Sequence, residues 1–211
     1  MLVRKVRLTN VFPVVNEKWR LWLPLGLMMI VFAITRWPGL MPQNFSAAYA
    51  MAFCAGIYFP RRLRWWVPLG TLFLLDLLLN GFYYHVPLVD GYTLFKLGAF
   101  SLIVWLGTLF SPKKSWFTMV SGGLIGALIF YLVTNIASWI FDPGYPKTLS
   151  GLIQALTTGL PGYPPTWTFL KNTLLSGGLF TGLFCGAMKM AEAAEEEEEE
   201  EPSEEAVPDE A

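Results

Sequence analysis

Residues 117–141 read FTMVSGGLIGALIFYLVTNIASWIF and contain no charged side chain. A transmembrane helix needs about 20 consecutive, mostly apolar residues, so this stretch is long enough to cross a bilayer. Hydrophobic residues make up 54% of the chain and charged residues 15%, whereas a typical soluble domain has about 25% charged residues. The sequence therefore indicates an integral membrane protein and excludes a chain that is disordered throughout.

Further apolar stretches lie on both sides of this segment. They cover residues 21–35, 45–59, 65–84, 95–110 and 166–188. The first, second and fourth of them are short for a full crossing. A shorter apolar piece at 149–156 is followed by several Gly and Pro residues, so it predicts a re-entrant or interfacial segment. The fold class that we expect is all-α, a bundle of six transmembrane helices with this segment before the last.

Charge is divided unevenly along the chain. Twelve of the sixteen acidic residues lie between Glu192 and Glu210, and all fifteen Lys and Arg residues precede them. We expect a basic cytoplasmic arm at 1–20, a six-helix transmembrane domain at 21–190 and a disordered acidic cytoplasmic tail at 191–211. This tail is either only hydrated, or it contacts the basic inner surface of the chain or of a partner.

The distribution of Lys and Arg predicts the orientation. With a cytoplasmic N-terminus, eleven basic residues lie on the inner side, and Arg36, Lys96, Lys147 and Lys171 lie at or near the outer side. Cytoplasmic loops of membrane proteins carry an excess of Lys and Arg, so this division favours the N-in orientation. Six crossings then place the C-terminus in the cytoplasm as well.

Strongly polar residues in the predicted spans gather in the outer half of the membrane. Our candidate substrate-binding residues are Arg36, Asn44, Asp76, Asn80, Asn135, Lys171 and Asn172. Convergent polar groups in an apolar surrounding are typical of a ligand pocket. We therefore expect a polar cavity that opens outward and binds a small-molecule ligand.

The same polar residues also have structural interpretations. Asp76 and Lys171 have similar predicted depths and could form a buried ion pair. The Asn side chains could form hydrogen bonds between helices, and Arg36 and Lys96 could reach lipid phosphates.

We predict no cofactor, no metal site and no catalytic chemistry. His85, the only histidine, is either part of the interfacial aromatic belt or a ligand to a pigment metal or haem iron. Cys54 and Cys185 are expected to be unpaired, buried thiols. The familiar metal, nucleotide and nucleophile motifs are missing from the sequence, and we expect no nucleic-acid partner.

Small residues recur at every fourth position in three stripes. These stripes are Ala48–Ala52–Gly56, Gly122–Gly126 and Gly178–Gly182–Gly186. Such faces let helices approach closely in lipid. They either pack the bundle internally or, for the third stripe in particular, dock a partner membrane protein.

A series of short motifs carries a resemblance to a known family. The motifs are Arg36-Trp37-Pro38, residues 42–46, residues 53–59, Pro68-Leu69, Asp76-Leu77, Thr134-Asn135, residues 145–148 with Gly151, and Phe169 with Asn172-Thr173-Leu174. Over residues 32–186 the chain resembles a family of small bacterial polytopic membrane proteins of unknown function. That family is similar in layout to the substrate-capture (S) components of energy-coupling-factor transporters.

The resemblance implies a multi-pass protein of the bacterial cytoplasmic (inner) membrane. It also implies capture of a vitamin or other micronutrient from outside, with a transmembrane coupling protein and two ATPases as partners in transport. Our first hypothesis is capture of a small polar solute. The alternative is an accessory subunit of a larger membrane complex, respiratory or photosynthetic, in contact with lipid or pigment. Both hypotheses require the lipid bilayer and other integral membrane proteins as partners.

Overall fold

The computed structural model describes residues 19–200, with side chains from Leu23 to Ala194, and this part of the chain is helical between its loops. The elements are α1 (Trp19–Thr35), α2 (Ala48–Tyr58), α3 (Trp66–Leu78), the π-helical turn η1 (Leu79–Tyr84), α4 (Gly91–Thr108), α5 (Trp116–Phe141), α6 (Leu149–Leu156) and α7 (Thr166–Glu200). Most of the predicted arm, 1–18, and the end of the predicted tail, 201–211, lie outside the described residues.

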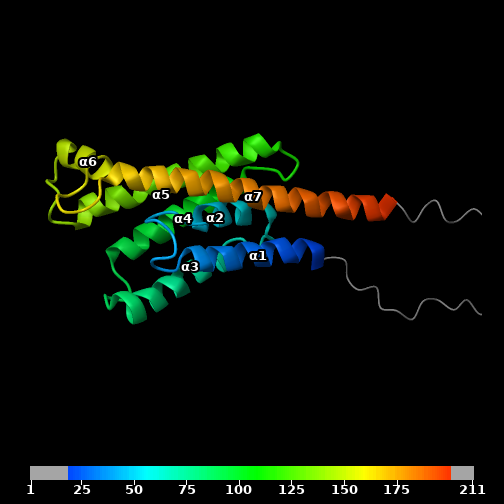
Figure 1. Cartoon of the computed structure of the whole chain (residues 1–211), viewed down its shortest axis with the longest axis horizontal. Coiled ribbons are helices and arrows are strands. Elements are labelled where there is room, and N and C mark those ends of the chain that lie inside the picture. The colour runs from blue at the N-terminus through cyan, green and yellow to red at the C-terminus, as the bar shows by residue number, and fades with distance from the viewer. Residues whose placement is uncertain (1–18, 201–211) are drawn as a thin grey trace, which may run out of the picture.

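Four segments of the described chain are long and apolar enough to cross a membrane. They are Trp66–Tyr84, Gly91–Thr108, Trp116–Phe141 and Thr166–Ala194, and two shorter apolar helices are Leu23–Thr35 and Ala48–Tyr58. This architecture confirms the all-helical, membrane-type part of the predicted fold class. Figure 1 shows the helices roughly aligned, with the start of α1 and the end of α7 at the same end of the bundle.

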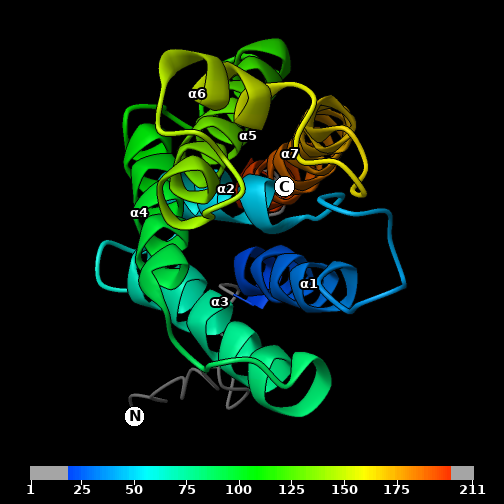
Figure 2. The ribbon, with the colours of Figure 1, turned by 90° about the vertical axis from the view of Figure 1, so that its left-hand side faces the viewer.

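Helix α2 lies at the centre of the bundle, between α1, α4, α5 and α7 (Figure 2). Each residue from Ala48 to Ile57 is buried. An eleven-residue helix rises only about 16 Å, which is about half the thickness of a ~30 Å hydrocarbon core. The loop at 37–46 precedes it. Most residues of this loop line a cavity.

Two glycines bring the backbones of α2 and α4 into contact. A Cβ on Gly56 would lie 2.3 Å from the carbonyl oxygen of Val104, and a Cβ on Gly107 would lie 2.2 Å from that of Phe53. Any larger side chain at these positions would force the helices apart. The first small-residue stripe, which includes Gly56, therefore packs inside the bundle.

Helices α5 and α7 also pack through small residues. A Cβ on Gly123 would meet the Thr181 side chain, and one on Gly177 would meet the side chain of Ala127. The third predicted stripe is half-buried; its Gly182 lies against the ring of Trp116, which donates from Nε1 to the Gly182 carbonyl oxygen at 2.9 Å. At Gly182 this stripe therefore faces α5.

The last helix continues beyond its predicted end. The sequence predicted a disordered tail from residue 191, but α7 runs to Glu200. Ala and Glu have high helix propensities, and the helix is already nucleated by the packed segment before it. The helical residues of the tail thus extend α7 past the apolar segment.

Cys54 of α2 and Cys185 of α7 are both buried and unpaired, as predicted. Their Sγ atoms lie 3.7 Å apart, which is far longer than a disulfide bond of about 2.05 Å. The two thiols thus act as small apolar groups in the contact between α2 and α7.

Candidate functional site

A cavity of about 660 Å³ lies at the end of the bundle opposite the start of α1 and the end of α7. Its wall comes from the ends of six α-helices, from η1 and from the loops at 36–47, 142–148 and 157–165. The polar and aromatic side chains of the lining include Arg36, Asn44, Ser46, Tyr49, Asp76, Asn80, Tyr84, Tyr92, Lys96, Thr134, Asn135, Ser138, Asp142, Tyr163 and Thr166. We call this end of the bundle the cavity end.

Asp76 is the centre of an ion-pair network on the cavity wall. Its Oδ1 accepts a hydrogen bond from Nη2 of Arg36 at 2.5 Å, and its Oδ2 accepts one from Nζ of Lys96 at 2.6 Å. The side chains of Asp76, Lys96 and Arg36 are 6%, 14% and 23% exposed, respectively. One carboxylate therefore pairs with two cations in a largely desolvated place.

Three separate helix ends supply these charges. Arg36 directly follows α1, Asp76 lies near the end of α3, and Lys96 lies in the second turn of α4. The loop that starts at Arg36 is anchored by Thr35, whose Oγ1 accepts a hydrogen bond from the Ala47 backbone N–H at 3.0 Å. This contact joins the end of α1 to the start of α2.

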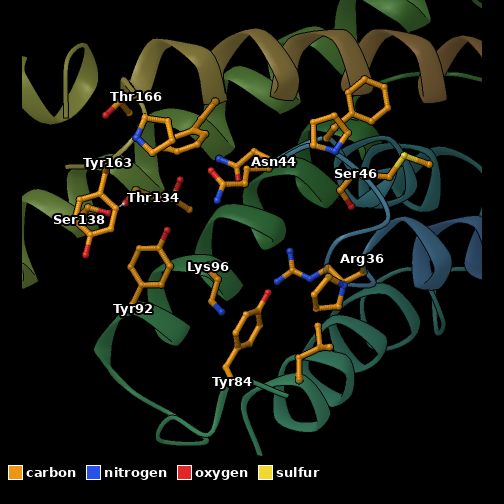
Figure 3. A pocket seen from close by; sticks show the side chains of 18 of the residues that line it. Arg36, Asn44, Ser46, Tyr84, Tyr92, Lys96, Thr134, Ser138, Tyr163 and Thr166 are labelled. Carbon is orange, nitrogen blue, oxygen red and sulfur yellow. Dashed lines mark hydrogen bonds between the residues drawn. The ribbon is translucent and has the colours of Figure 1, made fainter. Parts of the chain in front are cut away.

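Aromatic side chains surround the ion pairs. Figure 3 shows the Tyr84 hydroxyl pointing toward Arg36 and Lys96. The Lys96 ammonium lies 5.6 Å from the ring centroid of Tyr92, which is within the range of a cation–π interaction. Tyr84 belongs to η1, and π-helical turns often occur at functional sites.

The opposite wall carries hydroxyl and amide groups from α5. Thr134, Asn135 and Ser138 each donate to a backbone carbonyl one turn earlier, at 2.8, 2.7 and 3.1 Å. These bonds satisfy one donor of each group inside the helix. Their oxygen atoms can still accept further hydrogen bonds, so this wall offers acceptors in addition to those used by the protein.

The loop at 37–46 is held in place by hydrogen bonds to its backbone. The Tyr49 hydroxyl donates to the Asn44 carbonyl oxygen at 3.0 Å, and Asn172 Nδ2 donates to that of Gln43 at 2.9 Å. Asn44 itself has φ +60°, a left-handed conformation that Asn tolerates better than most residues. Asn44 therefore permits the turn that carries the chain from the cavity wall into α2.

The structure brings together five of the seven predicted site residues. Arg36, Asn44, Asp76, Asn80 and Asn135 all line the cavity. Asn80 uses its Nδ2 to donate to the carbonyl oxygens of Pro87 and Leu88, at 3.4 and 3.3 Å. It thus joins η1 to the loop before α4.

Lys171, a predicted site residue, does not line the cavity, and the alternative interpretation of an ion pair between it and Asp76 is also wrong. Asp76 pairs with Arg36 and Lys96 instead. Lys171 is exposed and continues an outward-facing stripe with Leu175 and Leu179, which are 55% and 50% exposed. Lys171 and Asp76 have similar predicted depths, but Lys171 lies on the face of α7 that points away from the bundle. Their charges therefore do not meet.

Asn172 and His85 lie near the cavity but are not among its lining residues. Asn172 acts on the loop through Gln43, as described above. His85 is exposed and adopts φ +53° at the end of η1. No group of three His, Cys, Asp or Glu side chains that could hold a metal ion occurs in the described part of the chain.

Sequence reasoning missed Lys96 and the tyrosines as site residues. Lys96 is the one charged residue of the otherwise apolar stretch 95–110. A charged residue within a predicted membrane span is a candidate functional residue, and this signal could have identified Lys96. Tyr84 and Tyr92 lie near helix ends. Tyrosines at helix ends are common at the membrane–water interface of any membrane protein, so their place in the sequence does not distinguish a binding residue from an interfacial one. Their place on the cavity wall follows from the packing of α3, η1 and α4.

The geometry suits binding by hydrogen bonds, charge and aromatic contact. A volume of about 660 Å³ falls within the 300–1,000 Å³ that is usual for small-molecule pockets. Three ionised groups of the lining, those of Arg36, Asp76 and Lys96, lie together, and α5 adds the uncharged hydroxyl and amide groups of Thr134, Asn135 and Ser138. The cavity can therefore hold a polar molecule with two chemically different ends.

The comparisons with known proteins give a family but no function. The model of a family described as "Family of unknown function (DUF6580)" matches residues 16–199. Neither the search of curated proteins nor the search of solved structures found a match.

Proposed function

The chain belongs to the DUF6580 family, and we propose that it captures a small polar solute from the outer side of a membrane. The observation that carries the proposal is the cavity, in which the buried charges of Arg36, Asp76 and Lys96 face a wall of hydroxyl and amide groups. Charges at membrane depth are costly and mark ligand or ion pathways in many membrane proteins. A solute would replace the hydration that these groups lose.

We further propose six crossings, with both termini in the cytoplasm. The loops after α2 and α4 contain Arg61, Arg62, Arg64, Lys113 and Lys114, and Lys189 Nζ donates to the carbonyl oxygen of Pro112 in the loop after α4. These residues lie at the end of the bundle opposite the cavity. Because positive charge favours the cytoplasmic side, this arrangement supports a cavity that faces outward.

In this proposal α6 lies at the outer membrane interface and does not re-enter the membrane. The helix has eight residues, Leu149–Leu156, and is too short to span. Leu149 and Ile153, four positions apart, are 74% and 54% exposed. Such an apolar stripe suits a helix that lies along the lipid surface.

Capture accounts for more of the molecule than the accessory-subunit alternative does. That alternative relied on small-residue faces free for a partner, and Gly182 of the third stripe is covered by Trp116. A layout similar to transporter S components would require a separate coupling protein and ATPases for transport. The chain itself would bind and release the solute without catalysis.

The test is solute binding by the purified chain in lipid nanodiscs, measured by native mass spectrometry and by the midpoint of thermal unfolding. The solutes are a panel of polar micronutrients. Ser138→Leu places an apolar group on the cavity wall, and Ser121→Leu makes the same change on α5 away from it. Both serines donate to the backbone carbonyl one turn earlier, at 3.1 and 2.9 Å, so the two changes cost the helix about the same.

We expect the wild type to bind at least one solute with a stoichiometry of one. Ser138→Leu should lower the affinity about tenfold or more, and Ser121→Leu should leave it unchanged. Equal loss in both variants, or no binding by the wild type, would contradict capture. Stable copurification with a large complex, with only lipid or pigment in the chain, would favour the accessory role.

A further inference from the structure

We infer that the captured solute is an organic anion, whose carboxylate or phosphate group binds between Arg36 and Lys96. This inference rests on the proposed function and assigns the chemical class of its ligand. It starts from the charges on the cavity wall, where four ionisable acidic or basic side chains occur: Arg36, Asp76, Lys96 and Asp142.

The inner part of this wall has an excess of one positive charge. Asp76 uses one carboxylate oxygen for each of its two cations, so it compensates one of them. Asp142 lies beyond the end of α5, where its Oδ1 accepts a hydrogen bond from the Gly144 backbone N–H at 2.8 Å. Lys147, which is not a lining residue, donates from Nζ to the backbone carbonyl oxygen of Asp142 at 2.8 Å, so this aspartate has a cation of its own nearby. The excess at Arg36 and Lys96 thus remains.

Both cations also have unused donors. The Nε of Arg36 is buried and has no hydrogen-bond partner among the described residues, whereas Nη2 is used by Asp76. A guanidinium presents five donors in a planar fork that matches the two oxygens of a carboxylate or phosphate. Lys96 has three donors, of which one is bound to Asp76. An incoming oxyanion would satisfy several of these donors together.

Two neighbouring groups favour the same ligand charge. The Tyr84 hydroxyl, which points toward Arg36 and Lys96 (Figure 3), can donate one more hydrogen bond. The N-terminus of α2 lies at the cavity end, and Ser46 and Tyr49 from this region line the cavity. The N-terminus of a helix carries a partial positive charge that stabilises anions.

The remainder of the cavity favours a soluble organic molecule over a lipid chain. Its far wall has the hydroxyls of Thr134, Ser138 and Thr166 and the amide of Asn135. Thr134, Asn135 and Ser138 already use one donor each inside α5, but an acyl chain would leave their acceptor oxygens without partners, at a cost in free energy. Tyr92 and Tyr163 add aromatic surface (Figure 3) against which a ring or a sugar could pack.

The inference is tested with pairs of solutes, each an acid and an uncharged counterpart with the same ring. The first pairs are 4-hydroxybenzoate with 4-hydroxybenzamide and phenyl phosphate with phenol, within a wider panel of acids and their amides or alcohols. Binding to the full chain is measured in nanodiscs of neutral lipid, and repeated in nanodiscs that contain phosphatidylglycerol. The variants are Arg36→Gln and Lys96→Gln. The control is Lys171→Gln, which removes the same charge from an exposed position outside the cavity.

We expect acids to bind and to raise the midpoint of unfolding, and their neutral counterparts to bind much more weakly. Arg36→Gln and Lys96→Gln should each lower the affinity for the acid about ten- to a hundredfold, and Lys171→Gln should not. If either cavity variant fails to fold, the comparison of acid with amide in the wild type decides the matter, and Lys96→Arg should retain acid binding.

The other outcomes separate this inference from the proposed function. If neutral solutes bind as well as acids, capture stands and the anionic class is overturned. If phosphatidylglycerol stabilises the chain through Arg36 and Lys96 and no soluble acid binds, the oxyanion belongs to a lipid and capture of a soluble anion is overturned. If neither acids nor neutral polar solutes bind, the inference and the proposed function both fail.

Discussion

The Oδ1 of Asp76 lies 2.5 Å from Nη2 of Arg36, although the two residues are forty positions apart in the chain. Arg36 follows α1 and Asp76 belongs to α3. In a protein of this apolar composition, such a contact stabilises the fold only if the desolvation of both charges is compensated. Lys96 contributes to that compensation from α4, through Oδ2 of the same carboxylate.

Replacement of Asp76 by Asn should therefore destabilise the chain. The change leaves Arg36 and Lys96 without their shared counter-charge, and breaking a buried pair in this way costs about 3 kcal/mol. The measurement is the midpoint of thermal unfolding in one detergent. Asp142→Asn is the control, because the amide oxygen can still accept the hydrogen bond from Gly144. Equal midpoints for Asp76→Asn and the wild type would show that the network adds no stability.

Replacement of Gly107 by Ala should loosen the contact of α2 with α4. The new Cβ would lie 2.2 Å from the Phe53 carbonyl oxygen, and because this atom is backbone, the helices must move apart. We expect a loss of about 2 kcal/mol or more, as for other overpacked sites.

Gly98→Ala on the same helix is the matched control for Gly107→Ala. A Cβ at Gly98 meets nothing within 4 Å, so the higher helix propensity of Ala should raise stability by up to about 1 kcal/mol. If both glycine variants have the same unfolding midpoint, the backbones of α2 and α4 do not approach each other as closely at Gly107 as described.

Acid should remove the stabilisation that Asp90 gives to the start of α4. Asp90 is the N-cap, and its Oδ1 accepts a hydrogen bond from the Thr93 backbone N–H at 2.8 Å. The Thr93 side chain donates to the same carboxylate, and these bonds lower the pKa of Asp90 below its ordinary value of 3.8. Because the folded-state pKa is the lower one, the stabilisation is complete above the unfolded pKa and is lost as pH falls through the folded pKa.

Asp90→Ala should thus cost about 1 kcal/mol at neutral pH, as loss of an N-cap does. The difference in unfolding midpoint between this variant and the wild type should shrink as the pH is lowered below 3.8. A difference that stays constant over this range would exclude the charged carboxylate as the source of the effect.

The thiols of Cys54 and Cys185 should resist alkylation in the folded protein. Both are fully buried, so a membrane-permeant maleimide should label neither in nanodiscs and both after denaturation, as counted by intact mass. Ser150→Cys, at an exposed position, should be labelled at once under the same conditions. Rapid labelling of the native cysteines would place them on an accessible surface instead.

The sequence by itself determined the class of this protein. The uninterrupted apolar stretch at 117–141 became α5, and the stretches at 65–84, 95–110 and 166–188 correspond to the other three long apolar segments. Membrane-spanning helices can be identified from the composition of each stretch alone, because in lipid a chain must satisfy its backbone hydrogen bonds within each helix. Local composition likewise selected Arg36 and Asp76 as polar residues in apolar surroundings, and both line the cavity.

Only the tertiary structure decided which charges meet. Depth along a helix can be computed from sequence, but the direction of a side chain around the helix axis depends on how the neighbouring helices pack. For this reason Lys171 shares a depth with Asp76 and yet faces outward, whereas Lys96 completes the network. The short, buried α2 and the loop before it depend on the same packing, because Gly56 and Gly107 let α2 lie inside the bundle.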